Sequence, residues 1–417
     1  MCGICGVLQV GGNPRRVIAP EVLDRMTDVM THRGPDDRGT FAADGVALGM
    51  RRLAIVDPAH GHQPVASEDG RVVAIQNGEL YNHEAVRAEL RRAGHAFRTD
   101  CDTEILPHVY EEYGPAFPEQ LRGKFAIAIW DGRRRRGVVA RDRLGIKPVY
   151  FAHSGDLLVF GSELKSVLAS GIVDTALDYE AIDLYLTLGF FPRGRTPLAA
   201  VRKLEPGERI VVADGRVDVE AYWEFPEPAP AAERSEDEWT AELLELLDES
   251  VRLRLMSDVP LGAMLSGGLD SSLVVALMAR HMAEPVKTFA IGFSDEGADN
   301  ELDDARFVAG ALGTDHHELE LSYASDVVDL PELVWHLDEP VADLSALGFH
   351  AVSQLASRYV TVALSGQGAD ELFGGYRKHR AAALVGRLGR ARGPIGAVAR
   401  HAPSLAVHSH NCTPRTR

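Results

Sequence analysis

The first six residues read MCGICG, and this stretch decides the fold expected for the first half of the chain. A small residue at position 2 permits removal of Met1, which would leave Cys2 with both a thiol and a free α-amine. An α-amine titrates at about pH 8, so part of it is unprotonated at neutral pH and can take the thiol proton, directly or through one water. Cys2 is therefore a candidate nucleophile for attack on an amide carbonyl.

The same motif has other interpretations. Cys2 and Cys5 could form half of a zinc site, but no second Cys-x-x-Cys completes four ligands. A redox pair would ordinarily sit at the start of a helix after a strand, whereas these cysteines lie at the chain terminus among glycines. On the motif alone, Cys2 could also be an ordinary terminal residue without a catalytic role.

The composition bounds the class of protein. A chain of 417 residues exceeds the usual size of one hydrophobic core, so two domains are expected. The net charge of -17 argues against nucleic acid or an anionic membrane as a partner. Four cysteines are too few for a disulfide scaffold, and there is neither a signal-peptide pattern nor a run apolar enough to cross a bilayer. These features predict a folded, cytoplasmic protein.

The region up to residue 212 reads as many short strands with few helices. The predicted strands are 4–10, 46–50, 72–76, 125–130, 138–141, 149–152 and 157–161, and the predicted helices are 21–30, 84–93 and 103–112. This mixture predicts an α+β domain of stacked antiparallel sheets flanked by helices.

A different pattern follows residues 224–238, which are rich in Pro, Ala and charge and lack periodicity. The predicted elements then alternate: helix 239–255, strand 261–265, helix 269–282, strand 288–293, helix 303–312, strand 317–321, helix 349–357 and strand 360–364. Such alternation predicts a parallel sheet in a doubly wound α/β domain. The expected organisation is a first domain over 2–212, a linker over 213–238 and a second domain over 239–417.

Seven ordered blocks accompany the opening motif. They are HRGPD (32–36), RLAIVD (52–57), NGELYN (77–82), DTE (102–104), GKFA (123–126), RDRLGIKP (141–148) and GSELK (161–165). With MCGICG they resemble a class II glutamine amidotransferase, which implies an N-terminal nucleophile fold. The resemblance implies that the Asn77 amide and the Gly78 N–H stabilise the oxyanion formed when Cys2 attacks glutamine.

The resemblance also implies how free glutamine is bound. Arg52 offers a bidentate fork for the α-carboxylate, and Glu79 and Asp102 would receive the α-ammonium. Taken alone, Asn77-Gly78 is a common turn dipeptide and Arg52 would more often lie on the surface. The Arg33, Lys124 and Arg141 blocks could equally shape the fold, so those residues are left out of the predicted site.

A second motif follows residue 258, where the apolar run VPLGAML (259–265) leads into SGGLDSS (266–272) and an apolar helix. Glycines let the backbone approach an anion, serine hydroxyls donate, and the new helix presents free N–H groups. The loop has no Lys, unlike a Walker A loop. A phosphate cradle and a simple tight connection are both compatible with these residues alone.

The full loop resembles the pyrophosphate loop of ATP pyrophosphatases, and LSGQGADELFGGY (364–376) resembles a block of the asparagine synthetases. Both halves together resemble the glutamine-dependent asparagine synthetase family. That implies glutamine, ATP and aspartate as substrates, Mg²⁺ held by Asp270 and Asp370, and an acyl-adenylate that ammonia attacks. The implied ATP-binding residues are Leu265, Ser266, Gly267, Gly268, Asp270, Ser271, Ser272, Ile291, Ser365 and Gly366. Either aspartate could instead be a helix cap, and a homodimer is considered as the oligomeric state.

Two features depart from that family. Gln367 stands where the family usually has a Glu tied to aspartyl-adenylate formation, and a neutral amide cannot act as a base. The chain also ends soon after residue 376 with no Asp or Glu after Glu371, which suggests a truncated or frameshifted reading frame or a divergent basic tail. Two alternative functions are therefore considered. One is amidation of another carboxylate, and the other is glutaminase activity alone.

Overall fold

The computed structural model describes residues 1–11, 17–227, 234–294, 301–322, 329–343 and 345–389. The chain forms two compact units, Met1–Pro260 with Val327–His350, and Leu261–Asp326 with Ala351–Arg417. No described helix is long and apolar enough to cross a membrane.

The first unit is built on two six-stranded sheets, in which every strand pair is antiparallel. The first sheet has the order β10-β8-β9-β1-β3-β2 and contains β1 (Gly3–Gln9), β2 (Asp37–Ala43), β3 (Val46–Arg52), β8 (Tyr150–Ser154), β9 (Leu157–Gly161) and β10 (Arg202–Lys203). The second has the order β12-β11-β7-β6-β5-β4 and contains β4 (Val65–Ala66), β5 (Val72–Leu80), β6 (Gly123–Asp131), β7 (Arg136–Arg141), β11 (Glu208–Ala213) and β12 (Arg216–Ala221).

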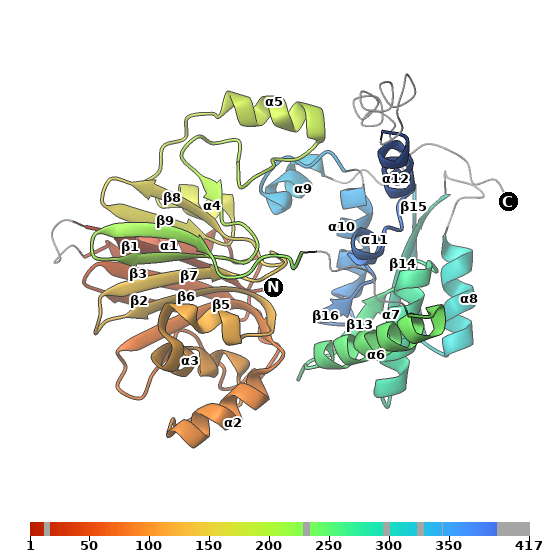
Figure 1. Cartoon of the computed structure of the whole chain (residues 1–417), viewed down its shortest axis with the longest axis horizontal. Coiled ribbons are helices and arrows are strands. Elements are labelled where there is room, and N and C mark those ends of the chain that lie inside the picture. Colours follow the sequence, from red (N-terminus) through yellow and green to blue (C-terminus); the bar gives the residue numbers. More distant parts are fainter. Residues whose placement is uncertain (12–16, 228–233, 295–300, 323–328, 344, 390–417) are drawn as a thin grey trace. The chain divides into compact units, whose positions relative to one another are not determined.

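The apolar residues of these strands form three hydrophobic clusters, one between the two sheets and one on the outer face of each sheet. Ile4 and Leu48 of the first sheet pack against Ile75 and Ala128 of the second, so the sheets are stacked face to face. The outer face of the second sheet packs against α2 (His83–Ala93) and α3 (Ile105–Tyr113), and that of the first against α1 (Pro20–Asp28) and α4 (Leu164–Ala169). Figure 1 shows α2 and α3 below the strands of this unit. The predicted N-terminal nucleophile fold is confirmed.

The second unit contains a four-stranded parallel sheet with the order β15-β14-β13-β16 (Figure 1). Its strands are β13 (Leu261–Met264), β14 (Lys287–Phe293), β15 (Asp315–Leu321) and β16 (Val362–Leu364). The helices α7 (Leu269–His281), α8 (Leu302–Leu312), α11 (Ala369–Phe373) and α12 (Arg377–Gly389) accompany it along the chain. Helix α10 (Ser345–Ala356) belongs to this unit from Ala351 onward. The order reverses direction between β13 and β16, as in a doubly wound α/β fold, which confirms the predicted class.

The structure differs from the sequence prediction mainly at polar elements. The segment expected as a linker from residue 213 contains β12, whose polar residues pair with β11 at a sheet edge. The helix expected at 239–255 is α6 (Glu236–Arg254), which begins earlier because Ser235 and Glu238 form a capping box. The helix expected at 103–112 is a 3-10 turn, η1 (Asp102–Glu104), followed by α3. Helix α5 (Tyr179–Leu188) was not predicted, and α9 (Leu330–Leu337) is a further short helix of the first unit.

Candidate active site

The predicted nucleophile, Cys2, lies directly before β1 and is half-buried. Its Sγ lies 3.6 Å from the carbonyl oxygen of Leu53, and its own carbonyl oxygen accepts a hydrogen bond from Arg33 Nε at 2.9 Å. Burial raises the pKa of the Cys2 thiol, an effect that the nearby charges of Lys147 and Arg52 partly offset. The thiol is therefore mainly protonated at neutral pH and needs a base to become a nucleophile.

The two predicted oxyanion donors are held in β5. Gly78 has a φ of 152°, and a Cβ there would collide with the carbonyl oxygen of Lys124, so glycine is required. Asn77 is fully buried, and its Nδ2 donates to Ser162 Oγ at 3.3 Å, while its Oδ1 has no hydrogen-bond partner among the described residues. Ser162 Oγ also accepts a hydrogen bond from the Ile4 N–H at 3.0 Å. One hydroxyl thus joins the strand that follows Cys2 to the strand that carries Asn77.

Arg52 ends β3 and is buried, with 3% of its surface exposed. Its Nη2 donates to the carbonyl oxygens of Val56 and Asp57 at 2.9 and 2.8 Å, and its Nη1 donates to that of Pro58 at 3.2 Å. The 56–58 loop therefore fixes the guanidinium in one orientation without supplying a carboxylate. This leaves the charge of Arg52 available for an anionic substrate group.

The two predicted acidic groups are also buried. Asp102 Oδ2 accepts hydrogen bonds from the Leu80 N–H at 2.8 Å and from Gln76 Nε2 at 3.2 Å. Glu79, next to Gly78 in β5, lies 3.4 Å from Lys124 Nζ. Both carboxylates therefore belong to the β5 region that holds the oxyanion donors, as expected for groups that bind one small substrate.

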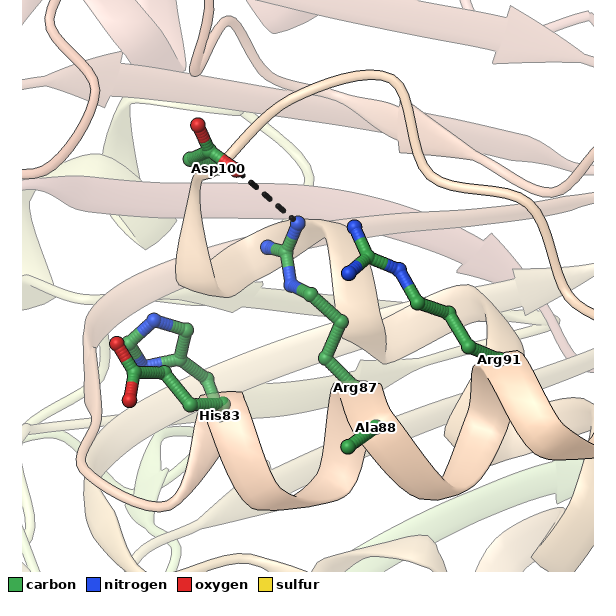
Figure 2. Close-up of a pocket in the computed structure, with 6 residues that line it drawn as sticks. His83, Arg87, Ala88, Arg91 and Asp100 are labelled. Carbon is green, nitrogen blue, oxygen red and sulfur yellow. Dashed lines mark ion pairs between the residues drawn. The ribbon is translucent and has the colours of Figure 1, made fainter.

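Helix α2 positions the loop that carries Asp102. Arg87 is buried and donates to the carbonyl oxygens of Thr99 and Cys101, the latter at 2.6 Å. Figure 2 shows Arg87 reaching from α2 toward Asp100, whose carboxylate lies 3.9 Å away. The surface pocket drawn there is lined by His83, Glu84, Arg87, Ala88, Arg91 and Asp100. Because Arg87 is satisfied by two main-chain carbonyls, it acts as a brace for the loop.

The Ser- and Gly-rich loop of the second unit lies at the carboxyl end of β13. Ser271 Oγ accepts a hydrogen bond from the Ser266 N–H at 3.2 Å and donates to the Gly268 carbonyl oxygen at 3.2 Å, which closes the loop on itself. Gly267 has a φ of 77° and lies against Asp304 of α8. Ser272 Oγ is buried and has no partner among the described residues. The closed loop and the first turn of α7 form the shape expected of an anion cradle.

The second predicted block follows β16, which pairs directly with β13 through Ala263 and Leu364. A Cβ on Gly366 would lie 2.6 Å from the Ser271 nitrogen, so this glycine lets the two loops touch. Burial, followed by the charges of Asp370 and Glu371, raises the pKa of Asp270. The predicted metal ligands Asp270 and Asp370 lie in the first turns of α7 and α11, next to the two loops that meet at Gly366, which suits a shared cation.

The remaining predicted nucleotide residues lie around this switch point. Leu265 is 1% exposed, Ile291 is partly buried in β14 beside the Phe289 core, and Ser365 Oγ accepts a 3.4 Å hydrogen bond from the Gln367 N–H. Gln367 itself is exposed. Ligands of open α/β sheets bind at such a reversal of strand order, so the position fits a nucleotide.

Comparison with known families agrees with both sites. A glutamine amidotransferase domain model matches residues 1–223, and an asparagine synthase model matches residues 242–411. The chain belongs to the asparagine synthetase family. Both predicted resemblances are thereby confirmed, each over the half of the chain whose motifs carried it.

Three relatives illustrate the range of this family. Asparagine synthetase 1 of Bacillus subtilis is 38% identical over 381 residues, which cover 91% of this chain and 60% of that protein. Asparagine synthetase 3 of the same species is 34% identical and covers 90% and 63%. Amidase chry2 of Gibberella zeae is 32% identical and covers 92% and 60%. The chain thus spans about 60% of the length of these curated relatives.

Three residues near Cys2 were absent from the predicted site. Ser162 bridges β1 and Asn77, and Arg33 holds the Cys2 carbonyl. Lys147 is 6% exposed, and burial together with the charges of Lys124 and Arg33 lowers its pKa to about 8. All three residues lie in sequence blocks that carry the family resemblance. The sequence therefore pointed to these blocks, but it did not show that these side chains lie near Cys2.

Proposed function

We propose that this chain hydrolyses glutamine at Cys2 and uses the ammonia for ATP-dependent amidation of a carboxylate, with aspartate as the first candidate. The observation that carries the proposal most is the Ser162 hydroxyl, which is hydrogen-bonded both to Ile4, in the strand that follows Cys2, and to the Asn77 side chain. These bonds would hold the nucleophile and the two oxyanion donors in a fixed position relative to each other. The substrate α-amino acid groups would be bound by Arg52, Glu79 and Asp102.

In the first half-reaction the α-amine of Cys2, exposed after loss of Met1, takes the thiol proton. The thiolate attacks the side-chain carbonyl carbon of glutamine, and the tetrahedral oxyanion receives hydrogen bonds from Asn77 and Gly78. Collapse with proton return to the nitrogen releases ammonia and leaves a thioester on Cys2. Water then attacks the thioester, which releases glutamate and restores the thiol.

The Asn77 side chain supports this role in one particular orientation. A 180° rotation of its amide exchanges nitrogen and oxygen at almost no change in shape. In that orientation Ser162 donates to Oδ1, which removes the unpaired buried oxygen, and Nδ2 is free to donate to substrate. We assign this orientation to the active enzyme.

In the second half-reaction a carboxylate attacks the α-phosphorus of ATP, which forms an acyl-adenylate and releases pyrophosphate. The residues fit the nucleotide: the loop 266–272 offers N–H and hydroxyl donors, including the unpaired Ser272 Oγ. Asp270 and Asp370 would hold Mg²⁺, which would offset the negative charge of the pyrophosphate. Ammonia then attacks the acyl carbon, and AMP leaves.

A second candidate function replaces aspartate with another carboxylate. It is favoured by Gln367, since a neutral amide stands where the family usually has an acid, and by a relative named as an amidase. A third candidate is glutaminase activity alone, with nucleotide binding but no turnover in the second unit.

Pyrophosphate release separates these candidates. With ATP, Mg²⁺ and ammonium chloride, release that depends on aspartate supports the first, whereas release without aspartate or with another carboxylate supports the second. No release with any carboxylate would leave the glutaminase alone. Full glutamate production by Cys2→Ala would disprove the assigned nucleophile, and loss of glutaminase with intact ammonia-dependent release would support it.

A further inference from the structure

Two histidines and two glutamates meet in the first unit, apart from the residues assigned to glutamine. We call this group the α3 cluster; it consists of Glu68, His95, His108 and Glu111, and each residue offers one ligand atom within 4.8 Å of the others. Glu68 follows β4, His95 follows the end of α2, and His108 and Glu111 share one face of α3 at a spacing of three residues. Three chain segments therefore converge on one point.

The distances within the α3 cluster suit a small metal ion. His95 Nδ1 lies 3.3 Å from Glu68 Oε1, and His108 Nδ1 lies 3.3 Å from Glu68 Oε2. Glu111 Oε2 lies 3.8 Å from His95 Nδ1 and 3.7 Å from His108 Nδ1. Four ligands at zinc bond lengths on a tetrahedron are about 3.3 to 3.6 Å apart, so these four contacts lie within a few tenths of an ångström of the tetrahedral spacing. The other pairs of ligand atoms lie within 4.8 Å and would approach each other by up to about 1 Å.

His108 supplies an independent sign that a ligand is missing. Its side chain is almost fully buried, yet its Nδ1 has no hydrogen-bond partner among the described residues. The contact with Glu68 is close but lacks hydrogen-bond geometry. A buried lone pair directed toward two carboxylates is costly unless a cation or a proton occupies the space.

The outer partners of the cluster fix each ligand in place. His95 Nε2 lies 3.1 Å from Glu112 Oε1, the carboxylate–histidine arrangement that commonly supports a metal ligand. Arg133 Nη1 donates to Glu111 Oε1 at 2.7 Å, which leaves Oε2 for the cluster. The Ala96 N–H donates to Glu68 Oε1 at 2.9 Å. Three of the four ligating groups are thus held by a further hydrogen bond to a residue outside the cluster.

We propose that the α3 cluster binds one divalent transition-metal ion, with Zn²⁺ the best match. Two imidazoles and two carboxylates suit zinc in tetrahedral geometry, whereas Mg²⁺ and Ca²⁺ prefer all-oxygen sites. The ion clamps the loop after β4 and the end of α2 onto α3. Because α3 directly follows the 3-10 turn that begins with Asp102, the clamp also stabilises the segment that supports the glutamine site.

Zinc titration of the full chain tests the proposal. The parent for this test carries Cys2→Ala, which removes the half-buried thiol as a competing ligand, and excess Mg²⁺ occupies the carboxylates of the second unit. After chelator treatment, calorimetry with Zn²⁺ is expected to show one tight site per chain, and the unfolding temperature is expected to rise with Zn²⁺. Tetrahedral Co²⁺ should give visible absorption at the same stoichiometry.

Matched variants locate that site. His95→Gln and Glu68→Gln should each weaken the tight site by about 100-fold or more and abolish the zinc-induced rise in unfolding temperature, and Glu112→Gln should weaken it by about 10–100-fold. His153→Gln, which changes an exposed histidine of β8, should retain parental binding. The zinc-induced shift is compared within each protein, so a change in metal-free stability does not obscure the result. Absence of a tight site, or an unchanged site in His95→Gln, would overturn the proposal and leave the cluster as a network of hydrogen bonds and protons.

Discussion

Replacement of Ser162 by Ala is expected to slow glutamine hydrolysis without impairing glutamine binding. The hydroxyl accepts from the Ile4 N–H and is paired with the Asn77 amide, and neither contact involves Arg52 or Asp102. Loss of an oxyanion donor itself costs about 10²–10³ in kcat. Because Ser162→Ala removes only the group that orients such a donor, we expect kcat to fall about 10–100-fold, or about 1.4–2.7 kcal/mol.

Ser166→Ala is the matched control for this change. Ser166 is equally buried, lies in the same segment and donates to the Met26 carbonyl oxygen at 2.9 Å, but it has no contact with Asn77. Both variants leave a buried main-chain group unpaired, which costs about 1–3 kcal/mol of stability. Glutamate formation gives kcat and KM, and thermal unfolding gives stability. A kcat for Ser162→Ala within twofold of the parent, or equal losses in both variants, would refute the orienting role.

Three further predictions follow from the two units. The pKa of Lys147 is lowered to about 8 from an ordinary 10.5, so the unfolded chain binds more protons than the folded chain between these two pH values. The unfolding free energy of the parent relative to Lys147→Met should therefore rise by up to about 3 kcal/mol as the pH increases through that window. Denaturant titrations measure this difference, and a difference that does not change with pH would contradict the burial of this amine. Asp270→Asn should abolish pyrophosphate release while glutamate production continues, and release at the parental rate would remove Asp270 from the metal site. Gln367→Glu should increase aspartate-dependent pyrophosphate release if position 367 limits adenylate formation, whereas an unchanged rate with aspartate and with other carboxylates would show that it does not.

The sequence predicted the regular elements well where apolar patterning is strong. Strands β5 and β6 carry almost unbroken buried runs, and both were predicted, although β5 extends four residues beyond the predicted range 72–76. Prediction failed for β12, whose residues are mostly polar and exposed and are held by pairing with β11 rather than by burial. Local patterning contains no information about a partner strand, so such edge elements emerge only from the assembled sheet.

The site was predicted as a set of residues but not as a geometry. Ser162 is 85 positions from Asn77 and 158 from Ile4, and no local rule connects these residues. Arg33 and Lys147 likewise approach Cys2 only in the folded chain, since both are distant from it in sequence. Family motifs predicted the nucleophile and the oxyanion donors, whereas the groups that orient them depend on long-range contacts.

The electrostatics of the second unit strengthen the Asp270→Asn experiment. Burial and the neighbouring charges of Asp370 and Glu371 raise the pKa of Asp270, so the folded state binds its proton more readily than the unfolded state does. Stability is therefore lost as the pH rises through the raised pKa, and at neutral pH the charged form opposes folding. Neutralisation by Asn removes this repulsion and should preserve or increase stability. A loss of pyrophosphate release in Asp270→Asn would consequently report a missing cation ligand and not a damaged fold.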